Sequence, residues 1–195
     1  MNRTTGATPA GDPVAALRSA TASRHQELDS GLPIGAPDAS LHDYAAHLAM
    51  LRAWLAPLQT WLAGFSNGPH FDQAARLALI DQDLAEQGMP AAPPPLSIAM
   101  AAWPHNASPA WRWGVCYVIE GSQLGGVVLY QRLHEQLAPH PLRYLKGADT
   151  GPGPRWRAFM LALREHVRSP QEIAEASAGA CAAFDSILAL GLHRR

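Results

Sequence analysis

Apolar residues recur every three to four positions along most of the chain, the spacing that places them on one side of an α-helix. The clearest case follows Ser40, where the apolar stripe consists of Leu41, Tyr44, Leu48, Leu51, Leu55, Leu58 and Leu62. We find no stretch of useful length that alternates apolar and polar residues as a half-buried strand does, and no internal repeat. The pattern therefore predicts an all-α fold.

Capping residues and helix breakers divide this pattern into separate helices. Asp12 followed by Pro13 is a typical helix start, and Ser40 with Asp43 three residues later has the spacing of a capping box. Pro57 lies inside that second helix, where we expect it to produce a kink. The predicted helices cover about residues 13–30, 41–62, 72–87, 108–137, 155–167 and 170–190, with a short element at Tyr144–Leu145.

The length of 195 residues, with 48% hydrophobic residues, fits one domain with a single core. We expect residues 1–12 to form a disordered tail and residues 13–195 to form one irregular helical domain with pockets between its helices.

Charge and composition limit the classes of partner. The net charge of −1 argues against nucleic acid as the main partner. The charge is nevertheless uneven, because residues 1–105 hold five Arg and nine acidic residues, whereas residues 106–170 hold eight Lys and Arg and four acidic residues. The second segment either faces an acidic partner or an anionic ligand, or is an ordinary solvated surface.

Two features concern the compartment. Cys116 and Cys181 both lie in apolar runs, which favours small buried thiols in a reducing environment. No apolar run reaches the roughly 18 residues of a membrane span, and the first dozen residues lack the apolar segment of a secretory signal. We therefore expect a cytoplasmic protein without a membrane partner.

The first predicted helix carries a candidate ligand group. Its core-facing positions include Leu17, Thr21 and Leu28. His25 lies at the edge of this face, with Arg18 about 10 Å before it along the helix and Asp29 one turn after it. An imidazole can ligate heme iron, a cation can pair with a propionate, and a carboxylate can orient the imidazole. A lone histidine at such an edge is also common as an ordinary surface or core residue, and this stripe alone leaves both interpretations open.

The helix predicted over residues 108–137 contains Gly121, Gly125 and Gly126 inside an apolar run. Each glycine in a helix interior costs roughly 0.8–1 kcal/mol relative to alanine, so a kink or a close backbone approach is expected to compensate. Gly121 and Gly125 are four residues apart and face the same way, so a flat macrocycle fits against their backbone. Close packing against another helix is the alternative explanation.

These segments resemble a known family. Leu17-Arg18-Ser-Ala-Thr21, followed by His25 and Asp29, resembles the proximal helix of heme oxygenases. The segment Tyr117-Val-Ile-Glu-Gly-Ser-Gln-Leu-Gly-Gly126 resembles the distal helix of the bacterial branch, which includes enzymes that supply biliverdin to phytochromes. The resemblance extends over about residues 14–190, and weaker matches lie at Leu79–Gly88, Ser108–Ala110 and Trp156–Phe159.

The resemblance implies a role for each matched residue. Heme would lie between a proximal helix and a kinked distal helix, with His25 as the iron ligand. The distal wall over the heme would consist of Gly121, Gly125 and Gly126. Arg18 stands where the family carries a propionate-binding cation, and Arg157 is a looser match to a second one.

Two positions depart from the family pattern. Ser122 replaces the acidic residue that the mammalian enzymes carry after the first distal glycine, and Asp29 replaces the Glu common one turn after the proximal histidine. We expect Ser122 to help hold the water that delivers protons, and Asp29 to orient His25.

The implied activity is the opening of heme to biliverdin, carbon monoxide and iron, with heme as both cofactor and substrate. The reaction consumes dioxygen and electrons, and the chain has no flavin or nicotinamide motif, so an external donor of the ferredoxin or flavodoxin type is expected. Its docking surface would use Arg112, Arg132, Arg143, Lys146, Arg155 and Arg157. A phytochrome is a candidate acceptor of the biliverdin.

Two alternatives stay open at this stage. A heme-binding or heme-sensing protein of the same fold would share His25 and the glycines without degrading heme. A thiaminase-like enzyme of the same fold class would use an acid or thiol nucleophile, and Cys116 is the residue that would be considered for that role.

Overall fold

The computed structural model describes residues 11–66, 68, 73–93, 103–147 and 151–191. The described part of the chain contains α-helices and one short 3₁₀ helix, and no strand. The helices are α1 (Pro13–Gly31), α2 (Leu41–Leu62), α3 (Gln73–Leu84), α4 (Pro109–Leu133), α5 (Arg143–Lys146), α6 (Gly153–His166) and α7 (Pro170–Gly191), and the 3₁₀ helix η1 covers Pro33–Gly35. The all-α prediction is confirmed.

The two predicted helix starts at Asp12 and Ser40 are confirmed by the capping hydrogen bonds of these residues. The Asp12 carboxylate accepts a hydrogen bond from the backbone N–H of Val14, directly before Pro13. Ser40 and Asp43 form a complete capping box, with each side chain bonded to the backbone of the other. These bonds satisfy backbone donors that the first turn of a helix leaves without partners.

The predicted helix ends are less accurate. Helix α3 ends at Leu84 rather than at residue 87, and α4 ends at Leu133 rather than at residue 137. In both places turns follow the helix. The predicted ends are too late because the apolar spacing continues into these turns, beyond the last helical hydrogen bond. Residues 1–10, which include most of the predicted disordered tail, lie outside the described residues.

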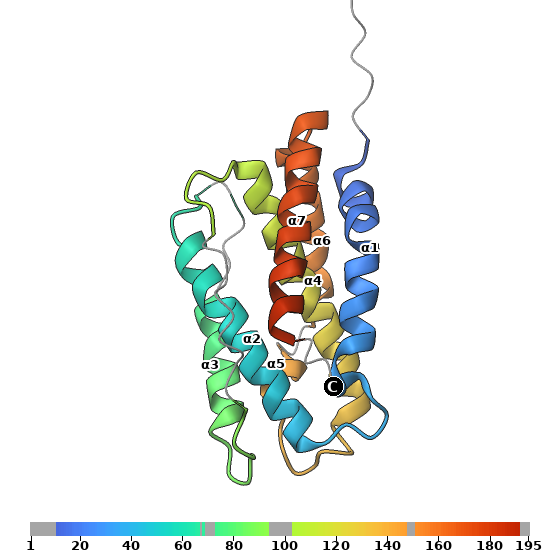
Figure 1. The fold of residues 1–195 in the computed structure, drawn as a ribbon, viewed down its shortest axis with the longest axis vertical. Coiled ribbons are helices and arrows are strands. Elements are labelled where there is room, and N and C mark those ends of the chain that lie inside the picture. Colours follow the sequence, from blue (N-terminus) through green and yellow to red (C-terminus); the bar gives the residue numbers. More distant parts are fainter. Residues whose placement is uncertain (1–10, 67, 69–72, 94–102, 148–150, 192–195) are drawn as a thin grey trace, which may run out of the picture.

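Helix α7 is the central element of the fold. Figure 1 shows α1 on one side of α7 and the α2–α3 pair on the other. Helix α4 packs along α7 most extensively, and α1 packs along it next. Much of the core lies around these contacts and includes Leu17, Trp54, Trp113, Ile119, Ala176, Ala180 and Ala183.

Small residues allow α4 and α7 to cross closely. A Cβ atom added at Gly114 would lie 1.8 Å from the carbonyl oxygen of Ala176, and one at Gly179 would lie 2.0 Å from the carbonyl oxygen of Trp111. No side chain fits at these distances, because the obstructing atoms are backbone. Gly114 and Gly179 are therefore the glycines that close helix packing requires.

Helix α7 is also long and apolar enough to cross a membrane, judged by length and composition alone, over Pro170–Leu190. We did not predict this span from the sequence, because we considered only uninterrupted apolar runs. Nearly half of that window is buried inside the molecule. The burial arises from its packing against α4, α1 and α2, which is typical of the core helix of a helical domain.

Candidate functional site

His25 and Asp29 form a pair on α1, as their spacing predicts. Nδ1 of His25 lies 2.9 Å from a carboxylate oxygen of Asp29. The ring of His25 packs against Phe184 of α7, with 5.7 Å between the ring centroids. The His25 side chain is 63% exposed, so its second nitrogen, Nε2, is available to a ligand. A carboxylate on Nδ1 fixes the ring orientation and makes Nε2 a stronger ligand.

The glycines of α4 have different surroundings from Gly114. Helix α4 continues through all three predicted distal glycines. A Cβ atom added at Gly125 would meet nothing within 4 Å, and Gly125 is exposed. Added Cβ atoms at Gly121 and Gly126 would make only ordinary contacts, 3.7 Å from Trp156 and 3.8 Å from Leu145. Helix packing within the chain therefore does not require glycine at these positions.

Arg18 connects α1 to α4. Its side chain is exposed and lies close to the side chain of Tyr117. Burial raises the pKa of Tyr117, and the nearby Arg18 guanidinium opposes that rise. The cation predicted to bind a propionate therefore lies where α1 approaches the start of the glycine segment.

This contact places His25 and Gly125 at a similar level. Helices α1 and α4 run in the same direction, and each packs against α7 (Figure 1). His25 lies seven residues after Arg18, a rise of about 10 Å, and Gly125 lies eight residues after Tyr117, a rise of about 12 Å. An available imidazole nitrogen on α1 and an open glycine surface on α4 thus occur at matching heights.

Ser122 makes several hydrogen bonds. Its hydroxyl donates to the backbone carbonyl of Ile119 at 2.7 Å, and the Gln123 side-chain amide lies 3.5 Å away as a donor. The same amide donates to the hydroxyl of Tyr144 at 3.1 Å, so Gln123 links Ser122 to Tyr144. The predicted polar residue of the distal wall therefore belongs to a small polar group between α4 and α5.

A second polar group lies beside the first distal glycine. Glu120 is 3% exposed and accepts hydrogen bonds from Arg76 of α3 at 2.5 Å and from Arg155 of α6 at 2.7 Å. Its carboxylate therefore connects α4 to two other helices. Breaking such a buried pair by removing one partner is strongly destabilising, because an uncompensated charge stays buried.

Sequence reasoning missed Tyr144, Gln123 and Glu120. An acidic residue inside an apolar helix is a signal of a buried ion pair, and Glu120 carries that signal. Tyr144 gives no such signal, because its contact with α4 depends on how the loop after α4 returns to the helix. The sequence predicts a short element there without indicating what it touches.

The structure does not bring Arg157 to the other candidate residues. Arg157 is exposed on α6 and makes no hydrogen bond or ion pair with the residues that the structure describes. Most of the other predicted docking cations have structural partners. Arg143 and Arg155 pair with buried carboxylates, whereas Arg112 and Arg132 donate to backbone carbonyls. The positive segment is thus not a continuous free surface.

Cys116 does not have the surroundings of a nucleophile. It is fully buried, and burial raises the pKa of its thiol well above the usual value. A buried neutral thiol reacts poorly, because the thiolate is the reactive form. These surroundings disfavour a thiaminase-like role for this residue.

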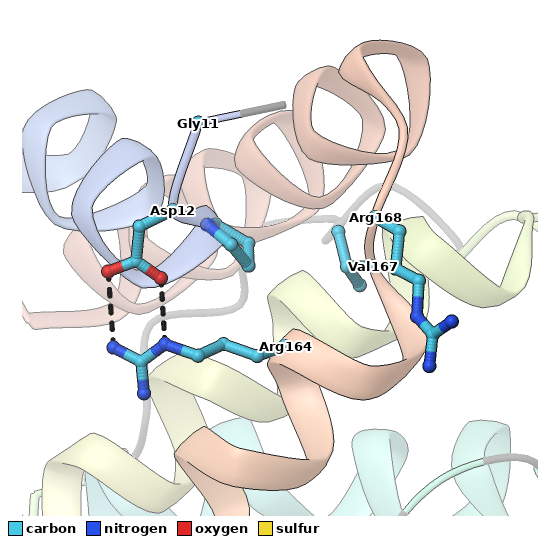
Figure 2. A pocket seen from close by; sticks show the side chains of 6 residues that line it. Gly11, Asp12, Arg164, Val167 and Arg168 are labelled. Carbon is cyan, nitrogen blue, oxygen red and sulfur yellow. Dashed lines mark hydrogen bonds and ion pairs between the residues drawn. The ribbon is translucent and has the colours of Figure 1, made fainter. Parts of the chain in front are cut away.

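An open pocket of about 470 Å³ lies at the start of α1. Figure 2 shows the side chains that line it. Asp12 and Arg164 form two hydrogen bonds across it, at 2.8 and 3.1 Å. The pocket also touches Gly11, Pro13, Val167 and Arg168, and includes none of the candidate site residues. Its lining is explained by helix capping and by the contact between α1 and α6.

Comparisons with known proteins address the identity of this arrangement. No protein-family model matches the chain. In the search of solved structures, heme oxygenase from Neisseria meningitidis with NO and CO bound matches at a TM-score of 0.71 and 24% identity, over 92% of this chain and 89% of that one. At this identity the match establishes the fold.

A curated relative establishes the family. A protein described as a heme oxygenase, from Xanthomonas campestris pv. campestris (strain 8004), is 36% identical over 143 residues, which are 71% of this chain and 79% of the relative. The resemblance to heme oxygenases is thus confirmed across most of both proteins. The chain belongs to the heme oxygenase family.

Proposed function

We propose that this protein binds heme between α1 and α4, with His25 as the iron ligand, and opens the ring oxidatively to biliverdin. Membership of the heme oxygenase family implies heme binding and heme degradation. The site assignment rests on one observation. The available His25 nitrogen on α1 and the open surface at Gly125 on α4 lie at a similar height along these two helices. Neither a heme sensor nor a thiaminase-like enzyme is favoured by the relatives.

The residues present fit heme. A flat ring needs a wall without side chains, and an added Cβ at Gly125 meets nothing within 4 Å. An iron ligand needs an oriented imidazole, and Asp29 holds His25 through Nδ1. A propionate needs a cation at the rim, and Arg18 is exposed beside Tyr117.

When bound, heme supplies the iron that activates dioxygen and the ring that is opened. The chain supplies position and protons. His25 would ligate the iron with its imidazole oriented by Asp29, and Arg18 would pair with a propionate. Gly121 and Gly125 would leave room for the heme and for dioxygen, because they carry no side chains. Ser122 presents a hydroxyl at the edge of that surface and helps to hold water there.

The partners belong to the same proposal. Electrons come from a ferredoxin or flavodoxin, since the sequence carries no flavin or nicotinamide motif. Arg157 is an exposed cation of the positive segment for which the described residues supply no ion-pair partner, so it is available for this docking. A phytochrome is the proposed acceptor of the biliverdin.

The test is a hemin titration of the purified protein, followed by ascorbate in air. We expect binding at one hemin per chain, then loss of the Soret band with formation of biliverdin. Added catalase controls for ring opening by free peroxide and should leave the rate unchanged. A saturating one-to-one complex that keeps its heme intact under reductant and air would contradict the enzymatic role and favour a heme-binding protein.

A further inference from the structure

The ring of His25 on α1 contacts a buried aromatic ring of α7. The ring centroids of His25 and Phe184 are 5.7 Å apart, and the two ring planes are tilted by 56°. Phe184 is 5% exposed and belongs to the hydrophobic core, whereas the His25 side chain is 63% exposed. A side chain that the core holds in place therefore lies directly beside a solvent-exposed imidazole.

Two further contacts fix the register of α1 against α7. The guanidinium of Arg24 donates two hydrogen bonds to the carboxylate of Asp185, at 2.6 and 3.1 Å. One turn earlier on both helices, the thiol of Cys181 donates to the backbone carbonyl of Ala20 at 3.4 Å. The two helices therefore run parallel here, and rotation of either one would break these contacts. The pair of rings is adjacent in sequence to the first of them.

The other partner of the His25 ring restrains it less. Asp29 orients the imidazole through Nδ1, at 2.9 Å, but its side chain is 68% exposed and lies on the same helix. An exposed pair of this kind is screened by solvent and contributes little. Phe184 instead belongs to a closely packed core, so it excludes alternative positions of the imidazole by its volume. Of these two neighbours, Phe184 is thus the more rigid one.

We propose that Phe184 is a positioning residue that keeps the His25 ring in the orientation in which Nε2 can ligate iron. This inference rests on the proposed function. A helical side chain has roughly two or three staggered χ1 positions, and packing against Phe184 restricts His25 to one of them. A ring that already has the binding orientation loses no affinity to its own ordering. Phe184 acts through His25 and not on the reacting atoms.

The test compares two buried phenylalanines. Phe184→Leu removes the aromatic ring and retains an apolar side chain. Phe159→Leu on α6 is the matched control, because Phe159 is 3% exposed and packs against Trp113 and Trp156. Both variants remove one ring from the core, but the ring that packs on His25 is lost only in Phe184→Leu.

The readout is the hemin dissociation constant, measured with His25 present and again in a His25→Ala background. With His25 present, Phe184→Leu should raise the constant by about 2- to 3-fold, because the ring then samples two or three χ1 positions in place of one. In the His25→Ala background the same substitution should have no effect. A general core defect would change the constant by the same factor in both backgrounds, and this is the expectation for Phe159→Leu.

Two further measurements keep the inference testable if Phe184→Leu fails to fold. Phe184→Met is closer in volume and should give the same result. In the wild-type protein without hemin, nuclear Overhauser effects should connect the ring hydrogens of His25 and Phe184.

Absence of those effects, an unchanged dissociation constant, or an equal change in both backgrounds would each overturn the inference and leave hemin binding through His25 intact. Failure of the wild-type protein to bind hemin would overturn the proposed function, and this inference with it.

Discussion

At the scale of single residues, Arg18 makes a contact that ligand binding would exchange for another. In the structure its guanidinium lies close to Tyr117 and is exposed to solvent. A propionate carboxylate is a stronger partner than a neutral phenol, because it carries the opposite charge and can pair with the guanidinium through two hydrogen bonds. In the proposed complex, Arg18 would therefore exchange its contact with Tyr117 for a stronger one with a propionate.

We predict that Arg18→Ala raises the hemin dissociation constant by roughly 10-fold, the lower end of the value of a charge-assisted hydrogen bond, because solvent screens this exposed side chain. Arg157→Ala is the matched control and should change the constant less than 2-fold, since Arg157 has no contact with the described site. Fluorescence quenching by hemin measures both constants. A larger effect of Arg157→Ala would reassign the propionate cation to α6.

At the scale of the element, α4 performs a different task on each of its faces. Gly114 packs against the backbone of α7, Glu120 pairs with arginines from α3 and α6, and Gly125 faces open space. The sequence shows all of these residues in one apolar helix, but it does not show which face meets which neighbour. Only the structure therefore distinguishes a glycine that helix packing requires, such as Gly114, from one that packing leaves open, such as Gly125.

This separation predicts opposite phenotypes for two substitutions in the same helix. Gly125→Leu should leave the melting temperature within a few degrees of wild type and abolish ring opening, because the side chain fills the ligand surface without touching the core. Gly114→Leu should prevent folding or lower the melting temperature strongly, since even its Cβ would lie 1.8 Å from a backbone oxygen. Circular dichroism and hemin turnover distinguish the two, and normal turnover by a folded Gly125→Leu protein would mean that this surface is not the heme site.

The sequence predicted much of α1 and α4 because their signals are local. Caps such as Asp12 and Ser40 form bonds within a few residues, and the His25–Asp29 pair follows from helical spacing alone. Contacts made across the fold had no local signal. Tyr144 reaches α4 through a loop, and the arginines of the positive segment find partners that are far away in sequence, so neither arrangement follows from periodicity.

At the scale of the whole molecule, one partly buried histidine couples stability to pH. Nδ1 of His47 on α2 is buried and has no hydrogen-bond partner among the described residues. Burial lowers the pKa of His47 to about 4. In the unfolded chain the same histidine has a pKa near 6.5. Between pH 6.5 and pH 4 the unfolded state therefore binds more protons than the folded state, and the free energy of unfolding decreases as the pH falls.

We predict that the free energy of unfolding decreases by about 2 kcal/mol between pH 7 and pH 5 through this residue. His47→Leu should remove that part of the decrease. His42→Leu, which changes an exposed histidine of the same helix, should retain it. Urea denaturation at several pH values measures the difference, and identical pH slopes for wild type and His47→Leu would show that His47 is not buried in its neutral form.

The charge of the whole molecule bears on the electron donor. Because Arg143 and Arg155 are ion-paired and Arg112 and Arg132 bond to backbone carbonyls, we predict only a moderate salt effect, a several-fold decrease in ferredoxin-dependent turnover from low to high ionic strength. Turnover with ascorbate should change little over the same range. A ferredoxin-dependent rate that does not depend on salt would contradict docking through these cations.

The spectrum of the ferrous carbon monoxide complex in His25→Ala tests directly whether His25 ligates heme iron. Wild type and the control His42→Ala should share the spectrum of a heme with a neutral imidazole ligand, and His25→Ala should lose it. A His25→Ala complex with the wild-type spectrum would show that another group holds the iron, and it would contradict the assignment of α1 as the proximal helix.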